Sequence, residues 1–294
     1  MADHYGDAEL IYGSFRNKLK PEVRAQTLAA SKWCVFKSVP EPVTAALVLN
    51  AVRERARRLQ GKIDLLQFHW NDYEDRNYLI VLAELVKLTK TCPSLVSHIG
   101  LCNFDAEHTE AVCQYLLAEI GEVGIVSNQV QFSLVDSRPL MKMVPVCERY
   151  GIKLLTYGTF CGGFLSNKWL GVKSPEIYCE TMGLTPSQRK YFDVISTWGS
   201  WSNLQTLLST LKTIADKHGV DVSNVAARWV LDCPTVGAVI VGTRLGVSSN
   251  IHSNLKVFAF CLDEEDRAKI EAVALGQRAR AVFERIGDCG TEYR

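Results

Sequence analysis

Three side chains that could exchange or guide protons occur within the first quarter of this 294-residue chain. Tyr5 lies in the segment Ala2-Asp3-His4-Tyr5-Gly6, and Lys32 and His69 lie near the ends of two apolar runs. Tyrosine, lysine and histidine are residue types that serve as general acids and bases. Each also has an ordinary alternative: Tyr5 as a residue near a chain end, Lys32 as an exposed lysine and His69 as a structural histidine.

Short apolar runs alternate along the chain with amphipathic segments, which predicts βα units around a parallel sheet. We expect strands at 26–33, 63–70, 98–103, 125–132, 153–158 and 238–243. We expect helices at 42–59, 78–90, 106–120, 139–150, 204–218, 223–231 and 263–274, followed by a polar tail. Functional groups of parallel α/β barrels lie at the carboxyl ends of the strands, which is where Lys32 and His69 fall.

Local signals mark several helix ends. Pro42 suits a first helical turn, and Asp105 and Ser223 are candidate N-caps. The sequence Lys217-His218-Gly219 is typical of a helix end, with cations in the last turn and then a glycine. Without a linker-like segment, the pattern predicts one domain over residues 1–294.

Composition narrows the class of protein. Hydrophobic residues make up 47% and charged residues 22%, as in soluble proteins with a sizeable core. The net charge of +1 gives no reason to expect a nucleic-acid or membrane partner. No apolar stretch approaches the roughly 18 to 20 residues that span a bilayer, and no secretory signal is apparent, so we expect a cytoplasmic protein.

The ten cysteines show no CxxC pair or other zinc-binding spacing. We therefore expect free thiols in a reducing compartment and no metal site.

Motifs along nearly the whole chain resemble those of the aldo-keto reductases. They are, in chain order, His4-Tyr5-Gly6-Asp7-Ala8-Glu9, Ser31-Lys32-Trp33, Leu65-Leu66-Gln67-Phe68-His69-Trp70, Ile99-Gly100-Leu101-Cys102-Asn103-Phe104, Asn128-Gln129-Val130, Leu155-Thr156-Tyr157-Gly158, Gly162-Gly163-Phe164-Leu165, Val239-Ile240-Val241-Gly242-Thr243-Arg244 and Asn254-Leu255-Lys256. The resemblance implies a (β/α)8 TIM barrel and NADPH-dependent reduction of an aldehyde or ketone by hydride transfer.

The resemblance also implies roles for the catalytic residues. Tyr5 would be the general acid, Lys32 would lower the pKa of its phenol, and His69 would hydrogen-bond the substrate carbonyl. Further positions would bind the cofactor: Cys102, Asn103, Gln129, Tyr157, Gly158, Phe160, Gly162, Gly163, Leu165, Gly242, Thr243, Arg244 and Asn254. Among these, Arg244 would contact the adenosine 2′-phosphate, Tyr157 would stack beneath the nicotinamide, and the glycines would let backbone N–H groups approach phosphates.

The chain departs from the family pattern at three points. The family's aspartate five residues before the tyrosine would fall just before Met1, Cys102 replaces a serine, and Ser253 stands where many members have an acid. Six expected strands instead of eight indicate a barrel that is incomplete at the N-terminus, through a fragment, a natural truncation or a rearranged start. Open sheet edges invite pairing, so we expect a homo-oligomer.

Two classes of function remain open. The first is the carbonyl reductase; the second is an altered member without redox activity that performs cyclisation, isomerisation or dehydration, or only binds nucleotide. The substrate is not readable from the sequence. Tyr178, Trp198 and Trp201 suggest an apolar or polycyclic carbonyl compound, with packing in the core as the alternative for these aromatic residues.

Overall fold

The computed structural model describes residues 1–176, 184–243 and 249–294, which form two compact units. The first comprises Met1–Gln129, Pro145–Lys153 and Gly290–Arg294. The second comprises the described residues of Val130–Val144 and Leu154–Cys289. A single domain over residues 1–294 stays a prediction.

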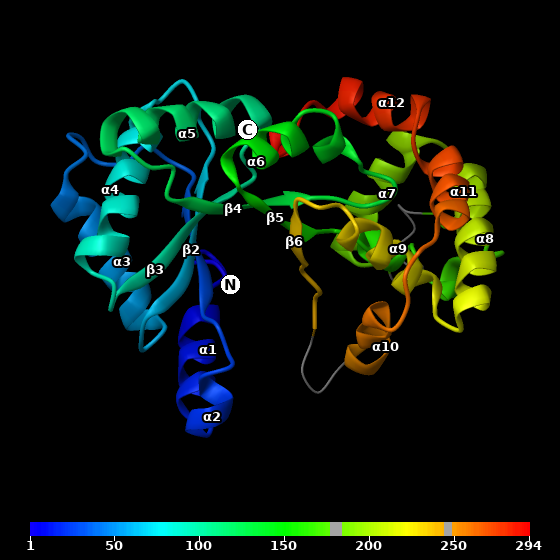
Figure 1. Cartoon of the computed structure of the whole chain (residues 1–294), viewed down its shortest axis with the longest axis horizontal. Helices are drawn as coiled ribbons and strands as arrows, with labels where there is room; N and C mark the ends of the chain where they lie inside the picture. Colours follow the sequence, from blue (N-terminus) through cyan, green and yellow to red (C-terminus); the bar gives the residue numbers. More distant parts are fainter. Residues whose placement is uncertain (177–183, 244–248) are drawn as a thin grey trace. The chain divides into compact units, whose positions relative to one another are not determined.

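Four strands run in parallel in the first unit (Figure 1): β1 (Ala30–Val35), β2 (Ile63–Trp70), β3 (Val96–Cys102) and β4 (Ile125–Gln131). The register aligns Cys34 with His69, and Cys102 with Gln129. Because the carboxyl ends of parallel strands share one edge, this register gathers Lys32, His69 and Gln129 toward that edge. The last five residues of β2 are buried, as expected for a strand covered on both faces.

The helices of the first unit are α1 (Ala8–Asn17), α2 (Pro21–Arg24), α3 (Ala45–Arg58), α4 (Asn77–Thr91), α5 (Ala106–Ile120), most of α6 (Met143–Tyr150) and the 3₁₀ turn η6 (Thr291–Tyr293). Helix α4 packs on β3 and contacts both α3 and α5 (Figure 1). Its apolar side chains Leu82, Leu85 and Val86 are almost fully buried. These helices cover the strands and so exclude water from the sheet behind the candidate residues.

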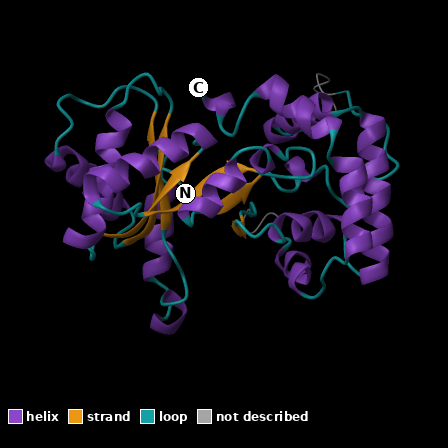
Figure 2. Ribbon diagram, turned by 45° about the horizontal axis from the view of Figure 1, so that its top comes forward, coloured by secondary structure: helices purple, strands orange, loops and turns teal. Residues whose placement is uncertain are grey.

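The second unit is mainly helical (Figure 2). Strands β5 (Lys153–Tyr157) and β6 (Val236–Val239) pair in parallel, and the Phe132 N–H donates to the Tyr157 carbonyl beside them. Its α-helices are α7 (Pro186–Trp198), α8 (Trp201–His218), α9 (Val222–Leu231), α10 (Ile251–Leu255), α11 (Glu264–Ala274) and α12 (Gln277–Ile286). Short 3₁₀ turns occur at η1 (Arg138–Leu140), η2 (Cys161–Gly163), η3 (Asn167–Trp169) and η5 (Lys256–Phe258).

Several sequence predictions are confirmed. Six strands occur in the described residues, and the bounds of β2 and α5 are those expected. Asp105 caps α5 through its carboxylate, which accepts a hydrogen bond of 2.8 Å from the His108 N–H. Helix α8 ends at His218, and Gly219 follows it in the left-handed conformation. These signals are local, and the tertiary structure leaves them unchanged.

Other expected boundaries were wrong. Strand β1 starts at Ala30, because α2 and the turn after it use residues up to Thr27. Helix α3 starts at Ala45 with Thr44 as its N-cap, so Pro42 lies outside it. Asp221, and not Ser223, is the N-cap of α9. Strand β6 lies at Val236–Val239, two residues before the expected start.

The helix expected at 139–150 and the expected polar tail also need correction. The first is the 3₁₀ turn η1 followed by α6, which starts at Met143. The tail contains α12, whose Ala279 and Val282 are buried in the second unit. The polar residues of α12 concealed its narrow apolar side in the sequence.

Candidate active site

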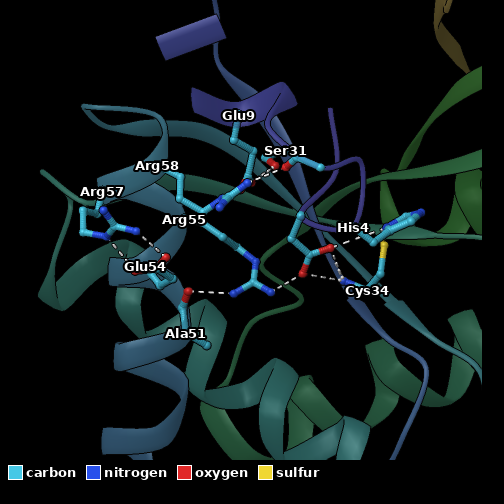
Figure 3. Close-up of polar contacts among 11 residues, drawn as sticks. His4, Glu9, Ser31, Cys34, Ala51, Glu54, Arg55, Arg57 and Arg58 are labelled. Atoms are coloured by element: carbon cyan, nitrogen blue, oxygen red, sulfur yellow. Dashed lines mark hydrogen bonds and ion pairs between the residues drawn. The ribbon is translucent and has the colours of Figure 1, made fainter. Parts of the chain in front are cut away.

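The segment with Tyr5 is fixed beside β1 by a buried ion pair. The Glu9 carboxylate of α1 is fully buried; the Arg58 Nε donates to it at 2.8 Å, and the Ser31 hydroxyl donates to it as well (Figure 3). Upstream, the Asp3 N–H donates to the Lys32 carbonyl at 3.2 Å. These contacts hold residues 3–9 against the strand that contains Lys32.

Lys32 and Tyr5 lie together, but their contact is not the expected one. Lys32 is 8% exposed; its ammonium lies 5.5 Å from the centroid of the Tyr5 ring and donates a hydrogen bond of 3.0 Å to the Met1 carbonyl. Tyr5 is 57% exposed. Partial burial, and then the thiols of Cys102 and Cys34, raise the pKa of the Tyr5 phenol. On balance the pKa is therefore shifted opposite to the direction expected from Lys32, whose ammonium faces the ring and the Met1 carbonyl; the lowering of this pKa by Lys32 stays a prediction.

His69 is buried and held by one hydrogen bond. Its Nδ1 lies 2.9 Å from the carbonyl oxygen of Cys102. A carbonyl oxygen can only accept, so Nδ1 donates, and Nε2 of the neutral ring is an acceptor. Burial lowers the pKa of His69, which favours the neutral ring at pH 7. The expected hydrogen bond from neutral His69 to a substrate carbonyl therefore does not fit this tautomer; Nε2 suits a hydroxyl donor.

Hydrogen bonds connect three amide residues, Gln67, Asn103 and Gln129, in the first unit. The backbone N–H of Asn103 donates to the backbone carbonyl of Gln129 at 2.9 Å. The side-chain Nε2 of Gln67 donates to the side-chain Oε1 of Gln129 at 2.8 Å. Within the described residues, the buried Gln67 Oε1 has no hydrogen-bond partner. Asn103 has a left-handed backbone, with φ of 59°. The backbones of Asn103 and Gln129 are thus paired, and the Gln129 side chain accepts from Gln67; the binding of a carboxamide by Asn103 and Gln129 stays a prediction.

Gln67 was missed by the sequence reasoning, although a signal for it existed. It lies two residues before His69 on β2, and residues at this spacing share one face of a strand. Cys102 comes directly before Asn103 and is buried, which raises the pKa of its thiol to about 11. A protonated thiol is a weak hydrogen-bond donor in place of the expected serine.

The C-terminal residues also reach this part of the first unit. The Arg294 guanidinium donates to the Trp70 carbonyl, the Asn103 carbonyl and the Tyr73 hydroxyl. The Tyr293 ring lies 6.0 Å from the His69 ring, between centroids. The expected polar tail gave no sign of these contacts, since a short polar segment has no periodicity to indicate where it packs.

The second unit contains a cavity of about 580 Å³. It is lined by Phe160, Gly163, Leu165, Ser166, Lys168, Trp169, Gln188, Ser223, Val241, Gly242, Asn250, Ser253 and Asn254. Thr243 lines a further cavity of about 440 Å³ that shares Phe160, Gly242 and Asn254 with the first. Five predicted cofactor residues therefore line the larger cavity, and Lys168, Gln188 and the three serines were missed. Arg244 lies outside the described residues.

Two N–H groups of the glycine turn at this cavity donate within the turn itself. Gly162 and Gly163 have φ of 62° and 91°, a conformation that favours glycine. However, the N–H groups of Gly163 and Leu165 both donate to the Phe160 carbonyl, at 2.9 and 3.2 Å. In this arrangement these two N–H groups close the turn, and a phosphate contact of the glycine backbone stays a prediction.

Two other expected cofactor residues lie near Lys190 and Tyr191. The Lys190 ammonium is 5.8 Å from the centroid of the Tyr157 ring, so it lies on one face of that ring. Gly158 has φ of 72°, and a side chain there would collide with the Tyr191 hydroxyl.

A family comparison settles the class of protein. The model of the family described as "Aldo/keto reductase family" matches residues 1–275. The chain belongs to the aldo-keto reductase family. A thermostable aldo-keto reductase crystallised with the inhibitor epalrestat has the same fold, with a TM-score of 0.64 and 20% sequence identity over 92% of this chain and 80% of that one. The α/β fold with a parallel sheet therefore matches the TIM barrel of this family.

Relatives of this aldo-keto reductase have diverse names. The chloroplastic pyridoxal reductase of Arabidopsis thaliana is 25% identical over 92% of the chain and 68% of its own length. The flagellar radial spoke protein 5 of Chlamydomonas reinhardtii is 32% identical over 58% of the chain, but the chain spans only 33% of that protein. Protein tas of Escherichia coli is 25% identical over 77% of the chain and 66% of its length. In the described residues, no helix combines the length and apolar character needed to cross a membrane.

Proposed function

We propose that this aldo-keto reductase reduces an aldehyde or ketone to an alcohol with NADPH, with Tyr5 as the general acid. The observation that supports this most is the grouping of Tyr5, Lys32 and His69 on neighbouring elements of the first unit. Tyr5 and Lys32 are in direct contact, and the rings of His4 and Phe36 connect Tyr5 to His69 through centroid distances of 4.3, 5.0 and 5.6 Å.

The protonation states suit reduction. A Tyr5 phenol whose pKa is raised keeps its proton at neutral pH and can donate it to a carbonyl oxygen. The Lys32 ammonium beside the ring then stabilises the phenolate that remains. His69 Nε2, as an acceptor, can hold the hydroxyl of the alcohol that forms.

The amide groups of the first unit fit a nicotinamide. A carboxamide has two N–H donors and one oxygen acceptor, and the buried Gln67 Oε1 is an acceptor in need of a donor. Gln129, which accepts a hydrogen bond from Gln67, and Asn103, whose backbone pairs with that of Gln129, would complete the binding of that group. When bound, the nicotinamide cofactor supplies the two electrons and the hydrogen for the carbonyl carbon.

The larger cavity of the second unit fits a phosphorylated ligand by its donors. Lys168 provides a cation, and the hydroxyl of Ser223 and the amide of Asn254 provide hydrogen-bond donors. The hydroxyls of Ser166 and Ser253 also line the cavity, but they donate to the Gly163 carbonyl and the Asp221 carboxylate. The cofactor roles of Tyr157, Gly158, Gly162 and Thr243, and the 2′-phosphate contact of Arg244, remain proposals.

The aromatic residues do not define the substrate. Trp198 is 2% exposed, packs in the core of the second unit and donates its N–H to the Ala274 carbonyl. Trp201 stacks on Phe192, and Tyr178 lies outside the described residues. The similarity to the pyridoxal reductase over most of the chain supports an aldehyde on an aromatic ring as the first substrate to test.

A second candidate is nucleotide binding without carbonyl reduction. It is favoured by the hydrogen bond from the Lys32 ammonium to the Met1 carbonyl, because this bond engages the ammonium with a group other than the phenol. The similarity of part of the chain to a radial spoke protein is consistent with a role other than catalysis.

The test combines binding and turnover. We expect NADPH to quench tryptophan fluorescence, and pyridoxal or another aromatic aldehyde to be consumed together with NADPH. Tyr5→Phe should lower turnover by about 10²–10⁴-fold, the usual contribution of a general acid, with unchanged NADPH affinity. Tyr115→Phe on α5 is the matched control and should retain activity.

The outcomes separate the two candidates. Quenching without turnover over a panel of aldehydes and ketones would favour the nucleotide-binding protein. Equal turnover in Tyr5→Phe and the parent chain would remove Tyr5 from the reaction.

A further inference from the structure

The segment before Tyr5 contributes to a cluster of metal-ligating groups that the catalytic proposal does not use. A carboxylate oxygen of Asp3, a ring nitrogen of His4 and the Sγ of Cys34 all lie within 4.8 Å of one another. We propose that these three side chains form a binding site for a divalent transition-metal ion, with Zn²⁺ as the best match.

The donor set supports this choice of metal. Zinc is bound by thiolate sulfur, imidazole nitrogen and carboxylate oxygen, usually in tetrahedral geometry. With metal–ligand distances of about 2.0–2.3 Å, the ligand atoms of a tetrahedral site are about 3.3–3.8 Å apart. Asp3 Oδ1 and His4 Nδ1 are 3.6 Å apart, so these two ligands already have the required spacing.

The carboxylate of Asp3 is oriented for this role. Arg55 donates to Oδ2, and the Cys34 N–H lies 3.3 Å from both carboxylate oxygens (Figure 3). The oxygen that faces His4 is Oδ1, and Arg55 holds the other one. Ion pairs of this kind fix a ligand and are common behind metal-binding carboxylates and imidazoles.

The other two ligands are also restrained. The His4 ring packs edge-on against the Phe36 and Tyr5 rings, with centroid distances of 5.0 and 4.3 Å. Cys34 is in β1, opposite His69, and Figure 3 shows its sulfur directed toward His4. The geometry therefore requires only small side-chain movements to bring the three ligand atoms around one ion.

The charges of the site are compatible with a dication. One carboxylate and one thiolate balance Zn²⁺, while Lys32 and Arg55 are the cations that face the cluster. Burial raises the pKa of the Cys34 thiol, so without metal it holds its proton and is a poor nucleophile. A bound zinc ion displaces that proton. The side chain of His4 is 40% exposed, which leaves a fourth position for water.

The experiment measures zinc binding by the full chain. In equilibrium dialysis against zinc chloride, we expect one zinc ion per chain, with at least tenfold weaker binding after His4→Ala or Cys34→Ser. Co²⁺ should give a thiolate-to-metal absorption band that Cys34→Ser abolishes. The matched controls are His252→Ala and Cys261→Ser, which remove an exposed imidazole and an exposed thiol in the second unit.

Each outcome decides the proposal. Loss of binding in the His4 and Cys34 variants alone supports it. No zinc uptake, or equal loss in the control variants, overturns it. Because the His4 side chain is 40% exposed and lies outside the core, its variant should fold, and retained zinc binding in that variant would also exclude the site. The zinc-binding experiment does not measure carbonyl reduction, so the result of this experiment is independent of the proposed function.

Discussion

At the scale of single residues, hydrogen-bond partners decide what each candidate group can do. The Cys102 carbonyl assigns the proton of His69 to Nδ1, and the Met1 carbonyl draws the Lys32 ammonium to the side of the Tyr5 ring. Neither partner is a side chain, so neither can be recognised from residue types. The same residues in another arrangement of these two carbonyls would favour different proton transfers.

The buried imidazole of His69 gives a prediction for stability against pH. Burial lowers its pKa below the unfolded value of about 6.5, so the unfolded chain binds more protons between these two pKa values. The free energy of unfolding should therefore fall as the pH drops below about 6.5. His69→Gln should reduce this slope, in urea unfolding measured over a series of pH values.

His252→Gln, which changes an exposed imidazole, is the control and should retain the slope of the parent chain. An unchanged slope in His69→Gln would show that His69 does not titrate differently in the folded and unfolded chains.

At the scale of elements, a buried carboxylate holds α1 and so places Tyr5, and the buried Gly13 packs against the backbone of Leu59. Ile11 and Phe15 of α1 are 68% and 50% exposed, so apolar burial does little to hold this helix. Glu9 anchors the helix: its carboxylate is fully buried and accepts hydrogen bonds from Arg58 of α3 and Ser31 of β1. A buried carboxylate needs such partners, because an unpaired charge in the interior is strongly unfavourable.

We expect Glu9→Ala to reduce the free energy of unfolding by about 2–3 kcal/mol, because it leaves Arg58 and Ser31 without their partner. This is below the usual cost of breaking a buried pair, since the Arg58 side chain is 22% exposed and regains water. Chemical denaturation provides the measurement.

Glu54→Ala is the control. It removes an equally short pair with Arg57 on the surface of α3, and exposed pairs of this kind contribute little. Equal effects of the two substitutions would mean that Glu9 does not anchor α1.

At the scale of the whole molecule, we consider the exposed apolar side chains of the first unit. Ile11 and Phe15, four residues apart on α1, lie on one side of the helix, and Leu28 before β1 is 74% exposed. Exposed apolar side chains that lie together, as Ile11 and Phe15 do, are typical of interaction sites. Self-association was expected from the sequence, and we propose that this surface is where it occurs.

Sedimentation velocity tests this prediction. The parent chain should sediment as an oligomer at micromolar concentration, and the double variant Ile11→Ser, Phe15→Ser should shift it toward the monomer. Ile251→Ser, which changes an exposed apolar residue of the second unit, should leave the oligomer unchanged. A purely monomeric parent chain would contradict the prediction.

The sequence by itself determined the family, the alternation of strands and helices, and the residue types of the candidate site. These features depend on local patterns: apolar periodicity fixed β2 and α5, Asp105 and Gly219 marked helix ends, and motif order pointed to the aldo-keto reductases. Such signals persist because they involve residues close together in the chain.

Only the tertiary structure decided which groups meet. Three contacts join residues that are 30 or more positions apart in the chain. Hydrogen bonds connect Gln67 to Gln129, Arg294 to Asn103, and Cys34 to Asp3 in the cluster with His4. No spacing rule in the sequence applies to such contacts. From the absence of a CxxC pair we expected no metal site. In the structure, strand β1 and the segment before α1 bring three types of metal ligand together. The register of β1 against β2 and the ion pair of Glu9 create these neighbours, and neither can be read from a local pattern.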